Sequence, residues 1–243
     1  MKGFITRIDL DESSKPEFCE ACAKVKSVRQ PYPQELYTRA EKYGNCVHWD
    51  LWGPASVKSL NGHFYVAAQI EDATRKTKLY FQEKKSKTLR SYKKDEAYIE
   101  TQTSNCIKTI HSDRGGEFLS GEFIQHQDSH RTIRKFTVHD SPQTWAERAQ
   151  ALLISSGLPH FLWEEAMKYS TWLQNQMPAQ ALNGKTPFEM KIGWKTNLAN
   201  IHEFRVAAYV KDLKARKLDS HVVVGRWWAC SSSATDNKLF CDF

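Results

Sequence analysis

Residues 46–52, CVHWDLW, are rich in apolar and aromatic side chains and are followed by Gly53-Pro54. This stretch predicts a β-strand that ends at a turn. Two further segments of the same kind follow, HFYVAAQIED (63–72) and TKLYFQ (77–82). Three consecutive strands indicate an antiparallel meander, from which the rest of the fold is built outward.

Helical and strand-like segments alternate after the meander. We expect helices at 86–102, 120–127, 146–156, 159–173 and 186–193, and strands at 106–113 and 132–138. In the first helix, Ser86 is the expected N-cap, and Asp95 and Glu96 interrupt an otherwise apolar face. The order of these elements predicts a mixed α/β sheet flanked by helices.

The bulk properties narrow the class of protein. A length of 243 residues favours one core with incomplete appendages, and a net charge of +7 favours polyanionic partners such as nucleic acid. The chain lacks an apolar run of about 18 residues and a secretory signal, so we expect an intracellular protein with no membrane span. Its six cysteines show one tight pair and four scattered singles, and we expect no disulfides.

Two aspartates suggest a metal site. Asp50 lies inside an apolar strand, where an ionised carboxylate needs a cation or several donors, and Asp113 ends a strand at a Gly-Gly turn. On neighbouring strands they could share Mg²⁺, and a third acid from a following helix would complete a two-metal site for phosphodiester chemistry. The alternatives are a common Asp-x-Gly-Gly turn and, for Asp50, an edge-strand charge that faces water.

Six sequence blocks, in order, resemble copia-type retrotransposon integrases. They are VHWDLWGP (47–54), GHFYVAAQIEDATRKTKLYF (62–81), IHSDRGGEFLSGEF (110–123), FTVHDSPQ (136–143), SSGLPHFLWEEA (155–166) and ALNGKTPFEMKIG (181–193). The resemblance implies a ribonuclease-H-like fold with a five-stranded sheet over residues 36–194. It also implies a D,D,E triad dependent on Mg²⁺ (or Mn²⁺) that trims DNA 3′ ends and joins them to target DNA. Asp50 and Asp113 would be its first two carboxylates. We expect the protein in the nucleus or the cytoplasm, and a homo-oligomer is a further option.

The third carboxylate departs from the family pattern. Glu147 follows Asp113 by 34 positions, slightly fewer than the family spacing. The residues around it, TWAERAQALLISSGLP, are more similar to a later, non-catalytic Glu-Arg segment of the family. Either Glu147 is the third metal ligand on a shortened helix, or about three helical turns that carry the true acid are absent.

The two ends of the chain also depart from the family. Cys19-x-x-Cys22 is similar to the cysteine half of the family's N-terminal zinc site, so residues 1–35 are expected to be its remnant. The alternative is two free thiols without zinc. Residues 195–243 are expected to be a degraded C-terminal extension. These departures indicate a decayed element or a faulty gene annotation.

Basic residues near the expected site are candidates for contacts with nucleic acid: Arg114, Arg131, Arg134 and Lys135. A second basic cluster, at 84–94, is explained equally well by a solvated helix face. The leading hypothesis is DNA integration. The alternatives are a catalytically dead DNA- or RNA-binding remnant and a ribonuclease-H-like hydrolase of RNA in hybrids.

Overall fold

A computed structural model describes residues 39–136, 144–195, 204, 206–211, 222–227 and 239–240. The strands are β1 (Cys46–Trp52), β2 (Tyr65–Glu71), β3 (Thr77–Gln82), β4 (Thr109–Ser112), β5 (Ile133–Phe136), β6 (Ala207–Lys211), β7 (Val222–Trp227) and β8 (Leu239–Phe240). The α-helices are α2 (Thr88–Thr103), α3 (Gly121–Ser129), α4 (Thr144–Ser156), α5 (Trp163–Gln176) and α6 (Pro187–Ile192). Short 3₁₀ helices are η1 (Lys85–Lys87), η2 (His160–Leu162) and η3 (Gln180–Leu182).

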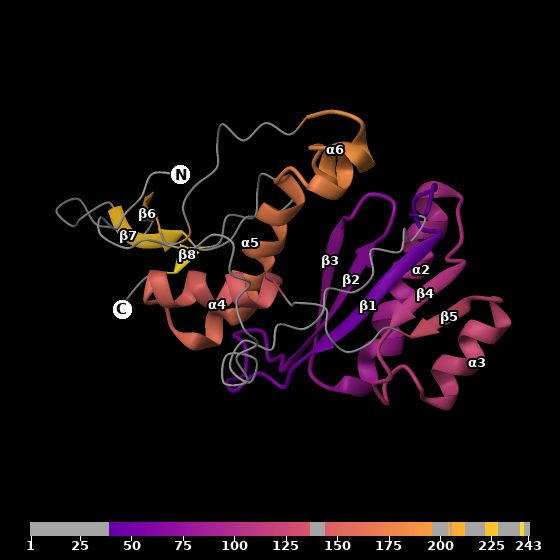
Figure 1. Cartoon of the computed structure of the whole chain (residues 1–243). Coiled ribbons are helices and arrows are strands. Elements are labelled where there is room, and N and C mark those ends of the chain that lie inside the picture. The colour runs from indigo at the N-terminus through magenta and orange to yellow at the C-terminus, as the bar shows by residue number, and fades with distance from the viewer. Residues whose placement is uncertain are drawn as a thin grey trace, which may run out of the picture. The chain divides into compact units, whose positions relative to one another are not determined.

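The first five strands form one mixed sheet in the order β3-β2-β1-β4-β5 (Figure 1). Strands β1, β2 and β3 pair antiparallel, whereas β1 with β4 and β4 with β5 pair parallel. The expected meander and the mixed five-stranded α/β sheet flanked by helices are therefore confirmed. Because β1 is the middle strand, the alternative that Asp50 is an edge-strand charge is wrong.

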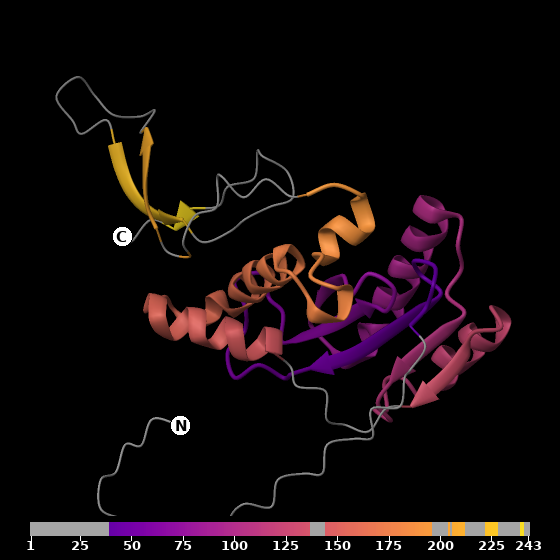
Figure 2. The same ribbon diagram turned by 45° about the horizontal axis from the view of Figure 1, so that its top comes forward.

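The two faces of the sheet bury different side chains. On one face, here the α2 face, Val47 and Trp49 of β1 and Ala67 of β2 form a core with residues of α2 and α3: Tyr92, Ile99 and Phe123. On the other, the α5 face, Val66 and Ala68 of β2 lie under residues of α4 and α5: Ala149, Trp163, Ala166 and Met167. Figure 2 shows α4 and α5 packed together at one side of the sheet. The larger apolar side chains among them, such as Val66, Ile99 and Phe123, each contribute about 1.5–3 kcal/mol when fully buried.

Two helices in the described part of the chain begin at a side-chain cap. The Ser120 side chain accepts a hydrogen bond from the Phe123 backbone at the start of α3, and Thr186 forms a capping box with Glu189 at α6. The expected cap at Ser86 is wrong. That residue lies within η1, and α2 begins only at Thr88, whose hydroxyl donates to the Lys85 carbonyl oxygen at 2.8 Å. The extra 3₁₀ turn displaces the helix start.

Strands β6, β7 and β8 form a separate three-stranded antiparallel sheet. They fall within the range 195–243, and the prediction that this range is a degraded extension stays a prediction. Residues 1–38, including Cys19 and Cys22, and residues 137–143 lie outside the described part, so the expected zinc remnant and the Pro142-Gln143 motif do too. Cys46 and Cys106 are free thiols, and within the described ranges no helix is both long and apolar enough to cross a membrane.

Candidate metal and nucleic-acid site

The sheet brings Asp50 and Asp113 to neighbouring positions. Strands β1 and β4 pair in parallel with Trp49 opposite Ser112, so Asp50 lies level with Asp113, one residue beyond the end of β4. One register step earlier, His48 lies opposite His111, and their ring centroids are 4.7 Å apart. Adjacent strands are about 4.8 Å apart. The register therefore places Asp50 of β1 beside Asp113, which directly follows the neighbouring parallel strand β4.

Asp50 lies on the α5 face. It pairs with Ala68, which belongs to the core under α4 and α5, whereas Val47 and Trp49 point to the opposite face. Asp50 is half-buried, and removing an ionised carboxylate from water is unfavourable unless a cation or donors compensate. This position suits a metal-binding carboxylate that is approached from the α5 face.

A tight turn holds Asp113. Its Oδ1 accepts a hydrogen bond from the Gly115 backbone N–H at 3.0 Å. A Cβ at residue 115 would lie 3.0 Å from Asp113 Oδ1 and 2.6 Å from Glu117 Oε1. Glycine therefore allows the backbone to approach the carboxylate closely, which fixes one oxygen of Asp113 within the turn.

Glu147 is not gathered with the other two acids. It lies in the first turn of α4 and is exposed, while Ala146 and Ala149 of the same turn pack toward the α5 face. Over the described residues, the groups of three or more Cys, His, Asp or Glu whose ligand atoms lie within 4.8 Å of one another do not include Asp50, Asp113 and Glu147 together. Its role as third ligand stays a prediction.

Of the four predicted basic residues, three are exposed and one donates to a carboxylate. Arg114 and Lys135 are both exposed: Arg114 directly follows Asp113 and its Cζ lies 5.9 Å from the centre of the Phe136 ring, whereas Lys135 pairs with His111 in the β4–β5 register. Arg134 instead donates to Asp128 Oδ1 at 3.1 Å. Arg131 is exposed.

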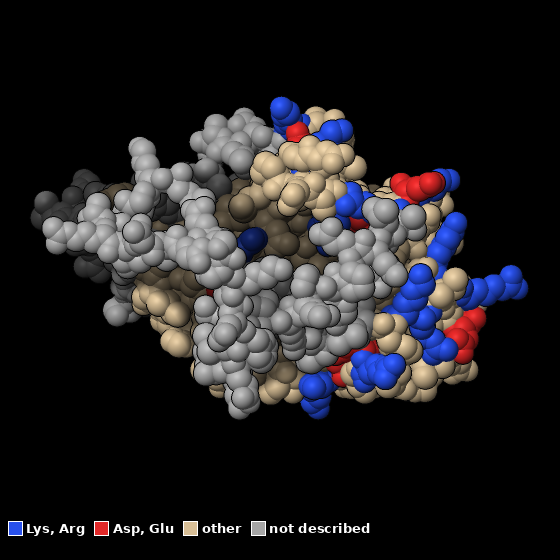
Figure 3. All heavy atoms as spheres, in the orientation of Figure 1, with Lys and Arg blue, Asp and Glu red and all other residues tan. Residues whose placement is uncertain are grey.

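The wider surface is rich in basic side chains. Figure 3 shows Lys and Arg gathered on the side that carries α3 and β5, with some Asp and Glu between them. The second basic cluster is exposed along η1 and α2: Lys84, Lys85, Lys87, Arg90, Lys93 and Lys94. Exposure fits both a solvated helix face and a surface for phosphates.

Sequence patterns missed the roles of two acids in α2. Asp95 is fully buried, and its Oδ1 accepts hydrogen bonds from Lys78 Nζ at 2.6 Å and from the Tyr80 hydroxyl at 2.7 Å. Glu96 Oε2 lies 2.6 Å from His126 Nε2 of α3. The interruption of an apolar helix face was the signal, but the partners come from β3 and α3 and are not adjacent in sequence.

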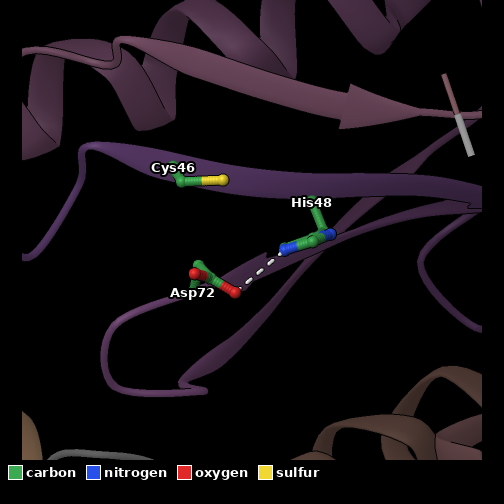
Figure 4. Close-up of side chains that lie close together, drawn as sticks. All are labelled: Cys46, His48 and Asp72. Atoms are coloured by element: carbon green, nitrogen blue, oxygen red, sulfur yellow. Dashed lines mark hydrogen bonds and ion pairs between the residues drawn. The ribbon is translucent and has the colours of Figure 1, made fainter. Parts of the chain in front are cut away.

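Another group of polar residues lies on the α5 face, at the end of β1 away from Asp50. Cys46, His48 and Asp72 have ligand atoms within 4.8 Å of one another (Figure 4). A hydrogen bond from His48, opposed by burial, lowers the pKa of Asp72 to about 2, and burial raises the pKa of the Cys46 thiol to about 11. Burial and the neighbouring His48 lower the pKa of His111.

No family model matches the chain. It is 28% identical over 213 residues to the retrovirus-related Pol polyprotein from transposon TNT 1-94 of Nicotiana tabacum, and 27% identical over 222 residues to that from transposon RE1 of Arabidopsis thaliana. The chain is similar to retrotransposon Pol polyproteins. These matches cover 83% and 86% of the chain but only 16% and 15% of the two relatives, so the chain spans about a sixth of their length. The recognition drawn from the six sequence blocks is thereby confirmed.

Solved structures with a similar arrangement are viral integrases. The HTLV-2 integrase catalytic core domain in complex with magnesium (dimeric form) aligns with a TM-score of 0.45 and 16% identity, covering 61% of this chain and 95% of that one. The simian T-cell lymphotropic virus intasome in complex with PP2A regulatory subunit B56 gamma gives 0.46 and 13%, covering 84% and 78%. Because both TM-scores are below 0.5 and both identities are below 25%, the description of the site depends on the geometry of this chain alone.

Proposed function

We propose that residues 36–194 are the catalytic core of a retrotransposon integrase, a polynucleotidyl transferase that acts on DNA. The observation that carries the proposal is the register of β1 with β4, which puts Asp50 level with Asp113, the residue that directly follows β4. Similarity to Pol polyproteins over most of the chain supports it. The element's DNA ends and the target DNA are the proposed substrates, the nucleus is the proposed place of action, and a homo-oligomer is the proposed assembly.

The donor set fits a hard divalent cation. Asp50 and Asp113 offer carboxylate oxygens, which Mg²⁺ and Mn²⁺ prefer, and a half-buried carboxylate is stabilised by a bound cation. A metal ion held there would activate a water molecule or a DNA 3′-hydroxyl and stabilise the leaving oxygen. Glu147 is proposed as the third ligand.

The remaining residues of the site position the nucleic acid. The exposed Arg114 and Lys135 lie beside Asp113 and His111 and can neutralise backbone phosphates without reading base sequence. Since the nucleophile is a water or a DNA hydroxyl, no covalent intermediate with the protein is needed.

The test is strand transfer on a duplex that carries the element's ends, with Mg²⁺ present. Asp50→Asn and Asp113→Asn are expected to reduce the rate by at least about 100-fold, because each removes a metal-binding charge. Glu122→Gln, an exposed acid of α3, is the matched control and should retain the wild-type rate. Equal product from Asp113→Asn would refute the carboxylate mechanism.

A second candidate is a catalytically inactive DNA- or RNA-binding remnant. The exposure of Glu147, apart from the other acids in the described part of the chain, favours it. Binding to duplex DNA that weakens with salt, together with no product in Mg²⁺ or Mn²⁺ from the wild-type chain, would support this candidate. Binding that is unaffected by salt would count against it.

A further inference from the structure

Three metal-binding side chains meet at one end of β1. Cys46 and His48 alternate on the α5 face of that strand, and Asp72 follows β2 directly, with its backbone N–H donating to the Cys46 carbonyl oxygen at 3.0 Å. Figure 4 shows His48 reaching toward Asp72, and His48 Nε2 lies 3.1 Å from Asp72 Oδ1. Paired strands therefore fix the backbone of all three residues.

The spacing suits a tetrahedral ion. Zinc bonds of about 2.0–2.3 Å place neighbouring ligand atoms roughly 3.3–3.8 Å apart. The nitrogen-to-oxygen distance of 3.1 Å is already close to that range, and all three ligand atoms lie within 4.8 Å of one another. Small side-chain rotations would bring the cysteine sulfur to coordination distance.

The cluster offers three ligands, and tetrahedral zinc takes a fourth. His111 of β4 lies opposite His48 in the register, and the two rings have centroids 4.7 Å apart.

The charge balance also permits a divalent ion. A cysteine thiolate and the Asp72 carboxylate together carry two negative charges, which match Zn²⁺. Arg75 Nη1 lies 3.4 Å from Asp72 Oδ1, and its partly exposed side chain can turn toward solvent.

We propose that Cys46, His48 and Asp72 form a zinc-type site that fastens β1 to the end of β2, with the fourth position left to a water molecule or to His111. Sulfur and imidazole select Zn²⁺ or Co²⁺ over Mg²⁺, unlike the oxygen donors of Asp50 and Asp113. The proposal does not rest on the proposed DNA chemistry.

The test uses Co²⁺ as a spectroscopic probe on the full chain with Cys19 and Cys22 replaced by serine, which removes the other thiol pair. Co²⁺ bound to a thiolate gives a near-ultraviolet charge-transfer band, and Zn²⁺ should displace it whereas excess Mg²⁺ should not. Cys46→Ser is expected to abolish the band. Cys106→Ser, which changes an exposed thiol, is the matched control and should keep it.

Two further variants test the other two residues of the cluster. His48→Ala and Asp72→Asn should weaken Co²⁺ binding by more than about 10-fold. Far-ultraviolet circular dichroism checks that each variant is folded. A band that persists in folded Cys46→Ser, that disappears in Cys106→Ser, or that never forms in the parent protein would overturn the proposal, whatever the outcome of the strand-transfer assay.

Discussion

Replacement of Lys78 by methionine tests the buried ion pair that joins β3 to α2. Lys78 Nζ lies 2.6 Å from Asp95 Oδ1, and the same oxygen accepts the Tyr80 hydroxyl at 2.7 Å. Asp95 is 0% exposed, and the Lys78 side chain is 18% exposed. Methionine keeps much of the apolar stem but leaves the Asp95 carboxylate without its cation.

The expected loss follows from burial. Removing one partner of a buried ion pair costs about 3–5 kcal/mol, because the remaining charge is uncompensated. Tyr80 still donates to Asp95 in the variant and Lys78 is partly exposed, so we expect about 3 kcal/mol. In a domain of this size that lowers the midpoint of thermal unfolding by roughly 6–12 °C.

The assay is a double-mutant cycle in urea, followed by tryptophan fluorescence and circular dichroism. Lys78→Met combined with Asp95→Leu removes both charges and should be much more stable than Lys78→Met alone. Lys93→Met, at an exposed position of α2, should change the free energy of unfolding by no more than about 0.5 kcal/mol. The reasoning is refuted if Lys78→Met is as mild as this control, or if the two single effects simply add.

Three further predictions concern pH, backbone conformation and DNA. Glu164→Gln should lower the free energy of unfolding by about 1–3 kcal/mol at pH 7 and by progressively less below about pH 4.3, as measured by urea unfolding across pH. Burial raises the pKa of the Glu164 carboxyl, but its hydrogen bonds outweigh burial and lower the pKa in the folded state. The stabilisation is therefore present above the unfolded pKa and is lost as pH falls through the folded pKa. Gly44→Ala should destabilise the fold by about 2–4 kcal/mol, because φ is 86° and the new Cβ would overlap a side chain of α2. The control is Gly184→Ala, where φ is 81° but the space is open, and it should cost only about 1–2 kcal/mol in the same assay. Lys135→Ala should reduce the slope of log affinity for duplex DNA against log salt by about 1, and Arg134→Ala, whose guanidinium already has a carboxylate partner, should change it less.

Local patterns predicted the elements well, and they failed where pairing sets the ends. The run CVHWDLW gave β1 to within a residue, but β4 spans only Thr109–Ser112 of the expected 106–113. The ladder between these strands begins with Cys46 opposite Thr109. The Lys108 N–H instead donates to the Asn45 carbonyl oxygen, in the connection that precedes the ladder. The sequence of one strand does not indicate where its pairing with the neighbouring strand begins or ends.

In the candidate site, too, some residues were predictable from local sequence and others depend on strand pairing. Asp50 and Asp113 were predicted because an acid in an apolar strand and an acid at a strand end are local signals. The meeting of Cys46 with Asp72 follows from the antiparallel register of β1 and β2, which places residues far apart in sequence opposite each other. Sequence spacing alone does not indicate that these residues meet, because the contact depends on which residues of the two strands pair.

The two sides of β1 allow its chemistry to be tested separately from its folding. Val47 and Trp49 are buried on the α2 face, whereas Cys46, His48 and Asp50 alternate with them on the α5 face and are only half-buried. A substitution at Cys46 or Asp50 therefore changes a ligand without removing a side chain from the core against α2. The strand-transfer and cobalt experiments can then report on two ends of one strand independently, because successive residues on a face are about 6.7 Å apart and neither variant touches the other's ligands.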